Sequence, residues 1–244
     1  MSSAARIAII TQARMSSTRL PGKVLLPAGG DTLLGWHLRR LRQTGLPVLL
    51  ATTTNATDDV LAGLGAAHGV PVTRGDEHDV LARFQLCAQE HDLDAVVRVT
   101  SDCPLLAPEL ITAGVARYRA AADPRLYLSN VLHRTYPRGY DFELFSRELL
   151  DEAARQAKRP AEREHVTPYI NQNRSGRVNF AHFTRAADAS RFRLTVDTPA
   201  DFALISALLT DHAAGELSGE ELITLLEAHP ELVALNAGVE QKLL

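Results

Sequence analysis

Short apolar runs alternate with segments of helical period along the first hundred residues, and this alternation constrains the fold more than any other feature of the chain. Runs rich in β-branched residues predict strands, and the periodic segments between them, two of which are closed by Gly45 and Gly69, predict helices. The predicted strands cover residues 7–10, 48–53, 70–73 and 95–100, and the predicted helices cover 32–43, 58–68 and 76–91. Repeated βα units with short loops indicate an α/β fold with a mostly parallel central sheet and helices on both faces.

The regular alternation weakens after Asp102, where a mixed segment, residues 107–189, predicts an irregular α+β insertion for acceptor binding or subunit contact. It contains a helix, strand-like stretches at 126–130 and 140–145, and a polar stretch at 159–165. After this segment the sequence predicts a returning strand at 193–197, an acidic helix from Pro199, and helical pieces at 219–227 and 231–235. A chain of 244 residues has the length of one large α/β domain. We therefore expect a single domain over residues 1–244.

Composition and charge narrow the range of partners. With 45% hydrophobic and 23% charged residues the chain is typical of globular proteins. No apolar run approaches the ~20 residues of a membrane span, and the N-terminus has no signal-peptide pattern, so we expect a cytoplasmic protein without membrane contact. Seven basic residues and one acid lie between residues 6 and 42, whereas nine acids and one base follow residue 196. Such local positive potential suits a small anionic ligand and argues against nucleic-acid binding.

A loop dense in phosphate-binding groups follows the first predicted strand. Between Ala13 and Lys23 it holds the cations Arg14, Arg19 and Lys23, three hydroxyls and a Pro-Gly turn. Backbone N–H groups, hydroxyls and cationic side chains complement phosphate oxygens, and open α/β sheets bind ligands at the carboxyl ends of their strands. The loop lacks both the Walker pattern and the G-x-G-x-x-G pattern of dinucleotide sites. It predicts a polyphosphate site, and a solvated charged loop is the alternative.

Two aspartates, Asp102 and Asp197, stand at the ends of predicted strands from distant parts of the chain. Polyphosphates usually bind together with a divalent cation, and Mg²⁺ is usually held by one or two carboxylates together with phosphates and water. The pair therefore predicts a magnesium site beside the phosphate-binding loop. The alternative is that each aspartate caps the helix after it, because Asp is favoured at N-caps and Asp197-Thr-Pro is a good helix start.

Five motifs carry a resemblance to a known family. They are A-R-x-x-S-x-R-x-P-G-K from residue 13, R-V-T-S-D-C-P-L from 98, Y-P-R-G-Y-D-F-E from 136, E-R-E-H-V-T-P-Y from 162 and T-V-D-T-P-A-D from 195. In this order the chain resembles the cytidylyltransferases that make CMP-activated acid sugars, such as the CMP-Kdo and CMP-neuraminate synthetases, and in particular their spore-coat polysaccharide biosynthesis F (SpsF-like) branch.

The resemblance implies a fold, an activity and partners. The fold would be that of the nucleotide-diphospho-sugar transferases, and the enzyme would be a Mg²⁺-dependent nucleotidyltransferase that forms a homodimer. It would transfer CMP from CTP to a small acidic acceptor in polysaccharide biosynthesis, with release of pyrophosphate. Two other hypotheses stay open: an enzyme of the same fold that uses another NTP or a phosphonate acceptor, and a non-catalytic sugar-nucleotide-binding module.

The resemblance also implies roles for single residues. Asp102 and Asp197 fall on the family's metal-binding aspartates, and Arg14 and Lys23 fall on its phosphate contacts. Arg19 has an ion pair with a carboxylate as its alternative role. The predicted nucleotide-binding residues are Ala13, Arg14, Ser17, Arg19, Lys23, Arg74 and Thr100, of which Arg14 and Lys23, together with Asp102, are predicted to be catalytic. Thr100-Ser101 replaces the Gln-Gly of CMP-Kdo synthetases, so the acceptor preference of those enzymes does not transfer directly.

The acceptor-binding residues are predicted within the insertion. Arg138 suits the carboxylate of an acid sugar, and Asp141 or Glu143 suits its hydroxyls. Glu164 and His165 are further candidates, with support of a helix start and a structural histidine as the alternatives. No Ser-His-Asp set or Cys-His pair has supporting context, which argues against a covalent intermediate.

Overall fold

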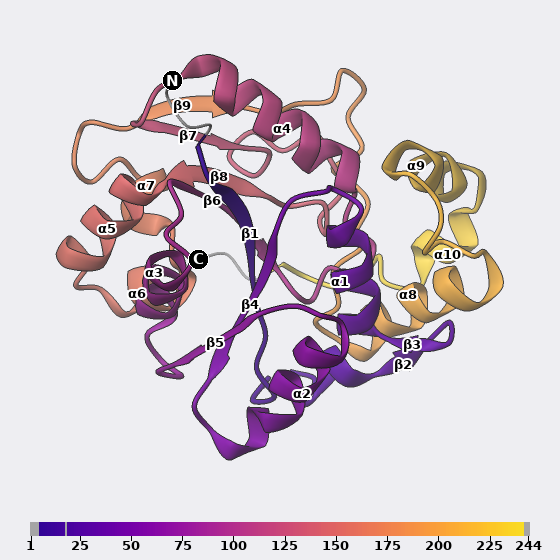
Figure 1. Ribbon diagram of the computed structural model, residues 1–244. Helices are drawn as coiled ribbons and strands as arrows, with labels where there is room; N and C mark the ends of the chain where they lie inside the picture. Colours follow the sequence, from indigo (N-terminus) through magenta and orange to yellow (C-terminus); the bar gives the residue numbers. More distant parts are fainter. Residues whose placement is uncertain (1–4, 18, 242–244) are drawn as a thin grey trace.

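The computed structural model describes residues 5–17 and 19–241, so Thr18 of the phosphate-binding loop and the basic residue Lys242 lie outside the described residues. Seven strands form a central sheet in the order β5-β4-β1-β6-β8-β7-β9 (Figure 1). The strands are β1 (Ile7–Gln12), β4 (Val48–Thr53), β5 (Val72–Gly75), β6 (Ala95–Thr100), β7 (Leu126–Ser129), β8 (Glu143–Ser146) and β9 (Asn179–His182). Four strand pairs are parallel, and β8 is antiparallel to both β6 and β7. The predicted mostly parallel α/β sheet is confirmed.

The two faces of the sheet bury separate apolar layers, because neighbouring strand residues point to opposite sides. Ile7 and Ile9 of β1 lie in one layer, and Ala8 and Ile10 lie in the other. The first layer packs under α1 (Leu33–Arg42), α2 (Asp59–Ala67) and α4 (Pro108–Ala121), and the second under α3 (Val80–Glu90) and α5 (Arg147–Gln156), as Figure 1 shows. The predicted doubly covered sheet is therefore observed.

A third apolar cluster joins the C-terminal helices to the body of the fold. These helices are α8 (Pro199–Asp211), α9 (Gly219–Ala228) and α10 (Pro230–Ala234), and two short helices, α6 (Pro160–His165) and α7 (Pro168–Asn171), precede them. A small hairpin, β2 (Pro27–Ala28) with β3 (Asp31–Thr32), and 3-10 turns at Lys23–Leu25 and Ala56–Asp58 complete the elements. Leu204 and Leu208 of α8 pack in one cluster with Leu33 and Trp36 of α1.

The predicted strand at 140–145 begins later, at Glu143. The side chain of Asn130 occupies the backbone groups just before it: Asn130 Nδ2 donates to the carbonyl oxygen of Tyr140, and the N–H of Phe142 donates to Asn130 Oδ1, at 2.8 and 2.9 Å. With these groups taken, the ladder to β7 starts at Glu143. The polar stretch at 159–165 forms α6, whose first turn is capped by the carboxylate of Glu162.

The prediction of a returning strand at 193–197 is wrong. The segment is extended, but the N–H of Leu194 donates to the carbonyl oxygen of Arg138 and that of Val196 donates to Asp102, at 2.7 and 2.8 Å. Because its backbone partners are two different loops, the segment forms one isolated bridge, between Arg138 and Arg193, and no ladder. It crosses the end of the sheet and brings Asp197 beside Asp102.

Among the described helices, none has the length and apolarity to cross a membrane.

Candidate active site

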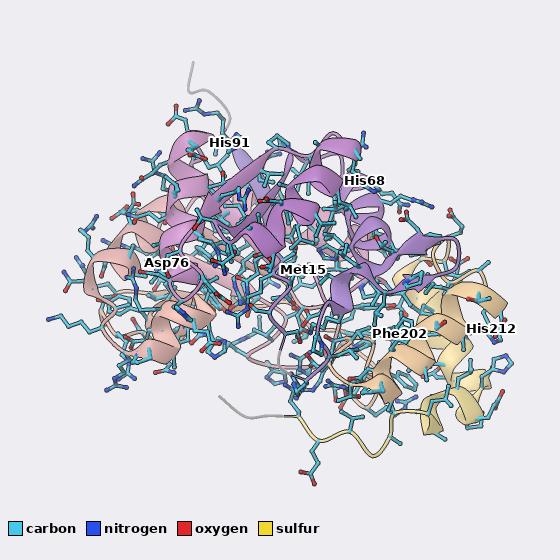
Figure 2. All side chains as sticks on the ribbon, turned by 90° about the horizontal axis from the view of Figure 1, so that it is seen from below. Met15, His68, Asp76, His91, Phe202 and His212 are labelled. Atoms are coloured by element: carbon cyan, nitrogen blue, oxygen red, sulfur yellow. The ribbon has the colours of Figure 1, made fainter. Side chains whose placement is uncertain are left out.

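A cleft of about 600 Å³ opens at the carboxyl ends of β1 and β6. Figure 2 views the molecule from this end, and Met15 of the loop after β1 lies near the middle of the view. Twelve of the fourteen predicted site residues line the cleft: Ala13, Arg14, Ser17, Arg19, Lys23, Thr100, Asp102, Arg138, Asp141, Glu164, His165 and Asp197. The fold thus brings both halves of the predicted site to one place.

Hydrogen bonds hold the loop after β1 to β4 and to the 3-10 turn that follows β4. The N–H of Met15 donates to Asp58 Oδ1 at 2.8 Å, and Thr52 Oγ1 donates to the carbonyl oxygen of Ala13 at 3.0 Å. Gly22 has φ +66°, which a residue without Cβ adopts at no steric cost, and its N–H donates back to the carbonyl oxygen of Met15 at 3.2 Å. Lys23 follows this turn directly, so the turn fixes the point from which its side chain enters the cleft.

Lys23 joins the two predicted metal-binding aspartates. Its Nζ lies 2.9 Å from Asp102 Oδ2, 2.9 Å from Asp197 Oδ1 and 2.7 Å from the carbonyl oxygen of Val196. Burial lowers the pKa of Lys23, but the two carboxylates outweigh it and raise the pKa overall. Burial likewise opposes ionisation of Asp102, yet the Lys23 ammonium and hydrogen bonds lower the pKa of Asp102 to about 2. Asp102 is therefore ionised, and the two carboxylates converge on one cation.

Asp197 is held by two further cations. Arg19 NH2 and Arg193 NH2 each lie 2.8 Å from its carboxylate, so Arg19 has the alternative role of a carboxylate partner. Arg193 also donates to Asp201 Oδ1 at 2.7 Å and to Gln241 Oε1, in the cleft wall, at 2.6 Å. The position of Asp197 is thus set by α8 and by the last described residue.

Neither aspartate caps a helix. Thr198 is the N-cap of α8, where its side chain accepts a hydrogen bond from the N–H of Asp201. The helix after Asp102 is α4, and its N-cap is Ala107. The capping alternative is wrong for both residues.

Arg14 reaches across the mouth of the cleft. Its guanidinium lies 4.0 Å from Glu77 Oε1, in the loop between β5 and α3, and 3.7 Å from Glu164 Oε1 of α6. A third of the Arg14 side chain is exposed. These long, partly exposed contacts are weak, so the guanidinium can exchange them for phosphate oxygens.

On the acceptor side of the cleft, Asp141 is bound by a cation, whereas the guanidinium of Arg138 has no partner among the described residues. Asp141 accepts two hydrogen bonds from Arg134, at 2.5 and 2.9 Å, in a fork-to-fork arrangement. Within the described part of the chain, the guanidinium of Arg138 forms no hydrogen bond or ion pair; burial together with the nearby cations Arg134 and Arg193 lowers its pKa. An anion placed beside Arg138 would relieve this repulsion, whereas Asp141 has little capacity left for a sugar hydroxyl.

Two predicted ligand-binding residues lie outside the cleft. Arg74 donates from Nε to the carbonyl oxygen of Thr53 at 2.7 Å and pairs with Asp59 at 2.7 Å, so it fastens the end of β4 to α2. Glu143 is 4% exposed and accepts hydrogen bonds from Arg98, Tyr127 and, at 2.7 Å, Thr167 Oγ1. Glu143 is therefore buried among three donors outside the cleft and is not placed to bind an acceptor.

Sequence reasoning missed several cleft residues, among them Gln12, Arg83 and Arg98. Buried Gln12 Oε1, Arg83 Nε and Arg98 Nε have no hydrogen-bond partner among the described residues, which leaves these atoms for a ligand or water. Arg98 had a usable signal, because period-two alternation places it on the same face of β6 as Thr100.

The donor set fits Mg²⁺ bound together with a nucleotide. Within residues 5–17 and 19–241 no three His, Cys, Asp or Glu side chains gather as a complete metal site. Asp102 and Asp197 nevertheless direct carboxylate oxygens at one point, and Mg²⁺ usually takes only one or two carboxylates, with phosphates and water as its other ligands.

The parallel sheet, the loop after β1 and the cleft beyond the strand ends define a nucleotidyltransferase of the nucleotide-diphospho-sugar fold. Residues 8–229 match the family model for cytidylyltransferases, and the chain belongs to that family. The resemblance seen in the motifs is thereby confirmed, and with it the assignment of the protein as an enzyme.

Similar proteins place the family in glycan synthesis. The chain is 36% identical to the spore coat polysaccharide biosynthesis protein SpsF of Bacillus subtilis, over 92% of this chain and 95% of that protein. A cytidylyltransferase structure from Leptospira borgpetersenii superposes with a TM-score of 0.90 at 32% identity, over 98% of this chain and 99% of the other. The CMP:2-keto-3-deoxy-manno-octonic acid synthetase solved with CTP shares the fold, with a TM-score of 0.64 at 20% identity over 85% of this chain and 100% of that one.

Proposed function

We propose that this cytidylyltransferase transfers CMP from Mg²⁺-bound CTP to a hydroxyl of a small acid sugar, with release of pyrophosphate, in polysaccharide biosynthesis. The observation that supports the proposal most directly is the convergence of Asp102 and Asp197 on Lys23, beside a loop built for phosphates. A pocket that binds only a sugar nucleotide has no need of two carboxylates that meet at one point.

The chain's own groups account for most of the catalysis by position and charge. Arg14 and Lys23 bind the β- and γ-phosphates, and Lys23 exchanges its carboxylate partners for phosphate oxygens as the nucleotide enters. Asp102 and Asp197 would hold Mg²⁺, which when bound would supply positive charge against the charge developing at the α-phosphate. Arg19 and Arg193 keep Asp197 in place throughout.

Arg138 selects the acidic acceptor. Its unpaired guanidinium lines the cleft beyond Asp102, in the half built by the 107–189 segment. A planar guanidinium with free N–H groups binds a carboxylate in two parallel hydrogen bonds. Arg98 lines the same cleft. Its NH1 group donates to Glu143, and its Nε has no hydrogen-bond partner among the described residues. A neutral sugar would leave the Arg138 guanidinium without a hydrogen-bonded counter-charge, whereas Arg98 keeps its ion pair with Glu143.

The direct test measures pyrophosphate release with CTP, Mg²⁺ and a panel of acid sugars that includes 3-deoxy-manno-octulosonate and N-acetylneuraminate. We expect Asp102→Asn to lower kcat by at least about 100-fold, because it removes a charge used in the transition state. The matched control, Asp59→Asn on the surface of α2, is expected to stay within twofold of wild type. Equal turnover by Asp102→Asn and wild type would refute the metal assignment.

The nucleotide preference is measured separately. Thermal shifts with each of the four NTPs and Mg²⁺ report selective binding, because a ligand that binds only the folded state raises Tm. We expect CTP to give the largest shift. Stabilisation by CTP with no pyrophosphate release from any acceptor would favour the non-catalytic binding module, and a larger shift with another NTP would favour an enzyme with a different donor.

A further inference from the structure

The acidic groups of the cleft are all engaged by cations. Asp102 and Asp197 share Lys23, Asp141 binds Arg134, and Glu164 faces Arg14. A carboxylate paired with a cation is a weak base, since the partner stabilises its ionised form. Asp102, whose pKa the Lys23 ammonium lowers to about 2, is accordingly a poor acceptor for a substrate proton at neutral pH.

Among the described residues that line the cleft, His165 is a candidate proton acceptor that forms no ion pair with a cation. It lies at the end of α6, and no described residue forms a hydrogen bond or ion pair with its imidazole ring. Three charged groups face it: Glu164 from its own helix, Arg98 from β6 and Arg14 from the loop after β1. Burial is the main cause that lowers the pKa of His165, and the two arginines add to it against Glu164. The ring is therefore neutral at pH 7 and able to accept a proton.

A strained turn fixes the backbone of His165. The next residue, Val166, has φ +69° and ψ −55°, and the N–H of Thr167 donates to the carbonyl oxygen of His165 at 2.8 Å. This is the rare γ-turn with positive φ, which is unfavourable for any residue with Cβ and more so for a β-branched one. Val166 is completely buried, so packing of its side chain holds the turn in this form. Strained backbone of this kind persists where surrounding structure imposes it, and it clusters at functional sites.

Hydrogen bonds secure both sides of the turn. After it, Thr167 Oγ1 donates to Glu143 at 2.7 Å, and Glu143 also binds Tyr127 and Arg98. Before it, Arg163 donates to the carbonyl oxygen of Ala154 at 2.7 Å and to Asp79 of the α3 N-cap. These hydrogen bonds hold the chain on both sides of His165 and thereby position its imidazole in the cleft.

We propose that His165 is the catalytic base of the transfer, the group that accepts the proton of the acceptor hydroxyl. The proposal rests on the function proposed above. The acceptor oxygen forms a bond to the α-phosphorus as the bond from that phosphorus to the bridging oxygen of the β-phosphate breaks. Pyrophosphate leaves with that electron pair, the hydroxyl proton moves to the unpaired ring nitrogen of His165, and it passes from there to water. Thr167 and Glu143 are positioning residues for the ring.

The first test is the pH dependence of kcat for wild type and His165→Gln, with CTP, Mg²⁺ and whichever acid sugar of the panel turns over. We expect His165→Gln to lower kcat by about 100-fold or more, within the range usual for loss of a general base. The KM for CTP should stay within twofold, and the fall of kcat on the acidic side of the profile should disappear. A kcat within threefold of wild type, or an unchanged acidic limb, overturns the proposal.

The second test addresses position. Thr167→Val removes the hydroxyl bound to Glu143, and Thr167→Ser keeps it. We expect Thr167→Val to lower kcat while the acidic limb remains, and Thr167→Ser to restore kcat. Equal kcat for both variants overturns the positioning role. A wild-type enzyme that turns over no acid sugar refutes the proposed function itself, whereas failure of the His165 proposal alone shows as equal turnover by wild type and His165→Gln.

Discussion

A buried histidine beneath the site should make the stability of this protein depend on pH in a calculable way. His37 of α1 is fully buried, and its ring lies 2.9 Å from Thr11 Oγ1 and 2.8 Å from the carbonyl oxygen of Cys103, next to Asp102. Burial lowers the pKa of His37 from 6.5 to about 4, although Cys103 and Asp102 act to raise it. The ring therefore stays neutral in the folded state where an unfolded chain would bind a proton.

The sign and size of the effect follow from linkage. Because the unfolded state binds the proton first, the stabilising contribution of neutral His37 is complete above about pH 6.5 and is lost as the pH falls towards 4. At about 1.4 kcal/mol per pH unit, the gap between 6.5 and about 4 corresponds to a loss of about 3 kcal/mol in the free energy of unfolding. That is a large share of the ~5–15 kcal/mol of an ordinary domain.

The assay is urea unfolding of wild type and His37→Gln at several pH values between about 7 and 4.5. Glutamine keeps a donor and an acceptor but does not titrate, so the difference between the two proteins isolates His37 from every other ionisable group. Over this interval, which stops short of the folded-state pKa, we expect wild type to lose about 2 kcal/mol more than the variant. His78→Gln, at an exposed loop position, is the control and should run parallel to wild type. Parallel curves for wild type and His37→Gln would refute the argument.

Three further predictions address the site and its frame. Lys23→Met should strengthen Mg²⁺ binding without nucleotide by at least about tenfold in calorimetry, because the ammonium stands where the two carboxylates meet; unchanged affinity would contradict that competition. Gly139→Ala should reduce the free energy of unfolding by about 2 kcal/mol more than Gly30→Ala, since both have positive φ but only at Gly139 would a Cβ meet backbone, 2.7 Å from Leu194; equal losses in chemical denaturation would refute the clash. Arg74→Ala should leave CTP affinity within about twofold by calorimetry, and a tenfold loss would restore Arg74 to the nucleotide site.

The sheet could be predicted because its signal is local. Buried strands such as β1 and β4 are written as continuous apolar runs, and the helix that follows β1 has a cap of its own, Thr32, whose hydroxyl binds the N–H of Gly35. The convergence of Asp102 with the loop after β1 was also predictable, since parallel neighbours end at the same edge of a sheet.

What the sequence did not reveal depends on pairing between distant segments. The apolar alternation around Leu194 correctly predicts an extended buried segment, but its backbone partners lie near Asp102 and Arg138 and leave no local trace. The role of Glu143 depends on register: antiparallel pairing of β6 with β8 sets Glu143 directly opposite Arg98. Neither residue predicts the other until the strand order is known, so the sequence alone predicts a ligand-binding role for Glu143.

The contact between Arg193 and Gln241 has a practical consequence for anyone who handles this enzyme. Gln241 lies in the cleft wall, and Arg193 connects it to the carboxylate of Asp197. A reporter group attached at Gln241 would therefore stand in the wall of the cleft, one guanidinium away from Asp197. A metal-chelating label at this position would compete with the cation and the nucleotide that we propose for the site, so probes for kinetic work belong on another face of the molecule.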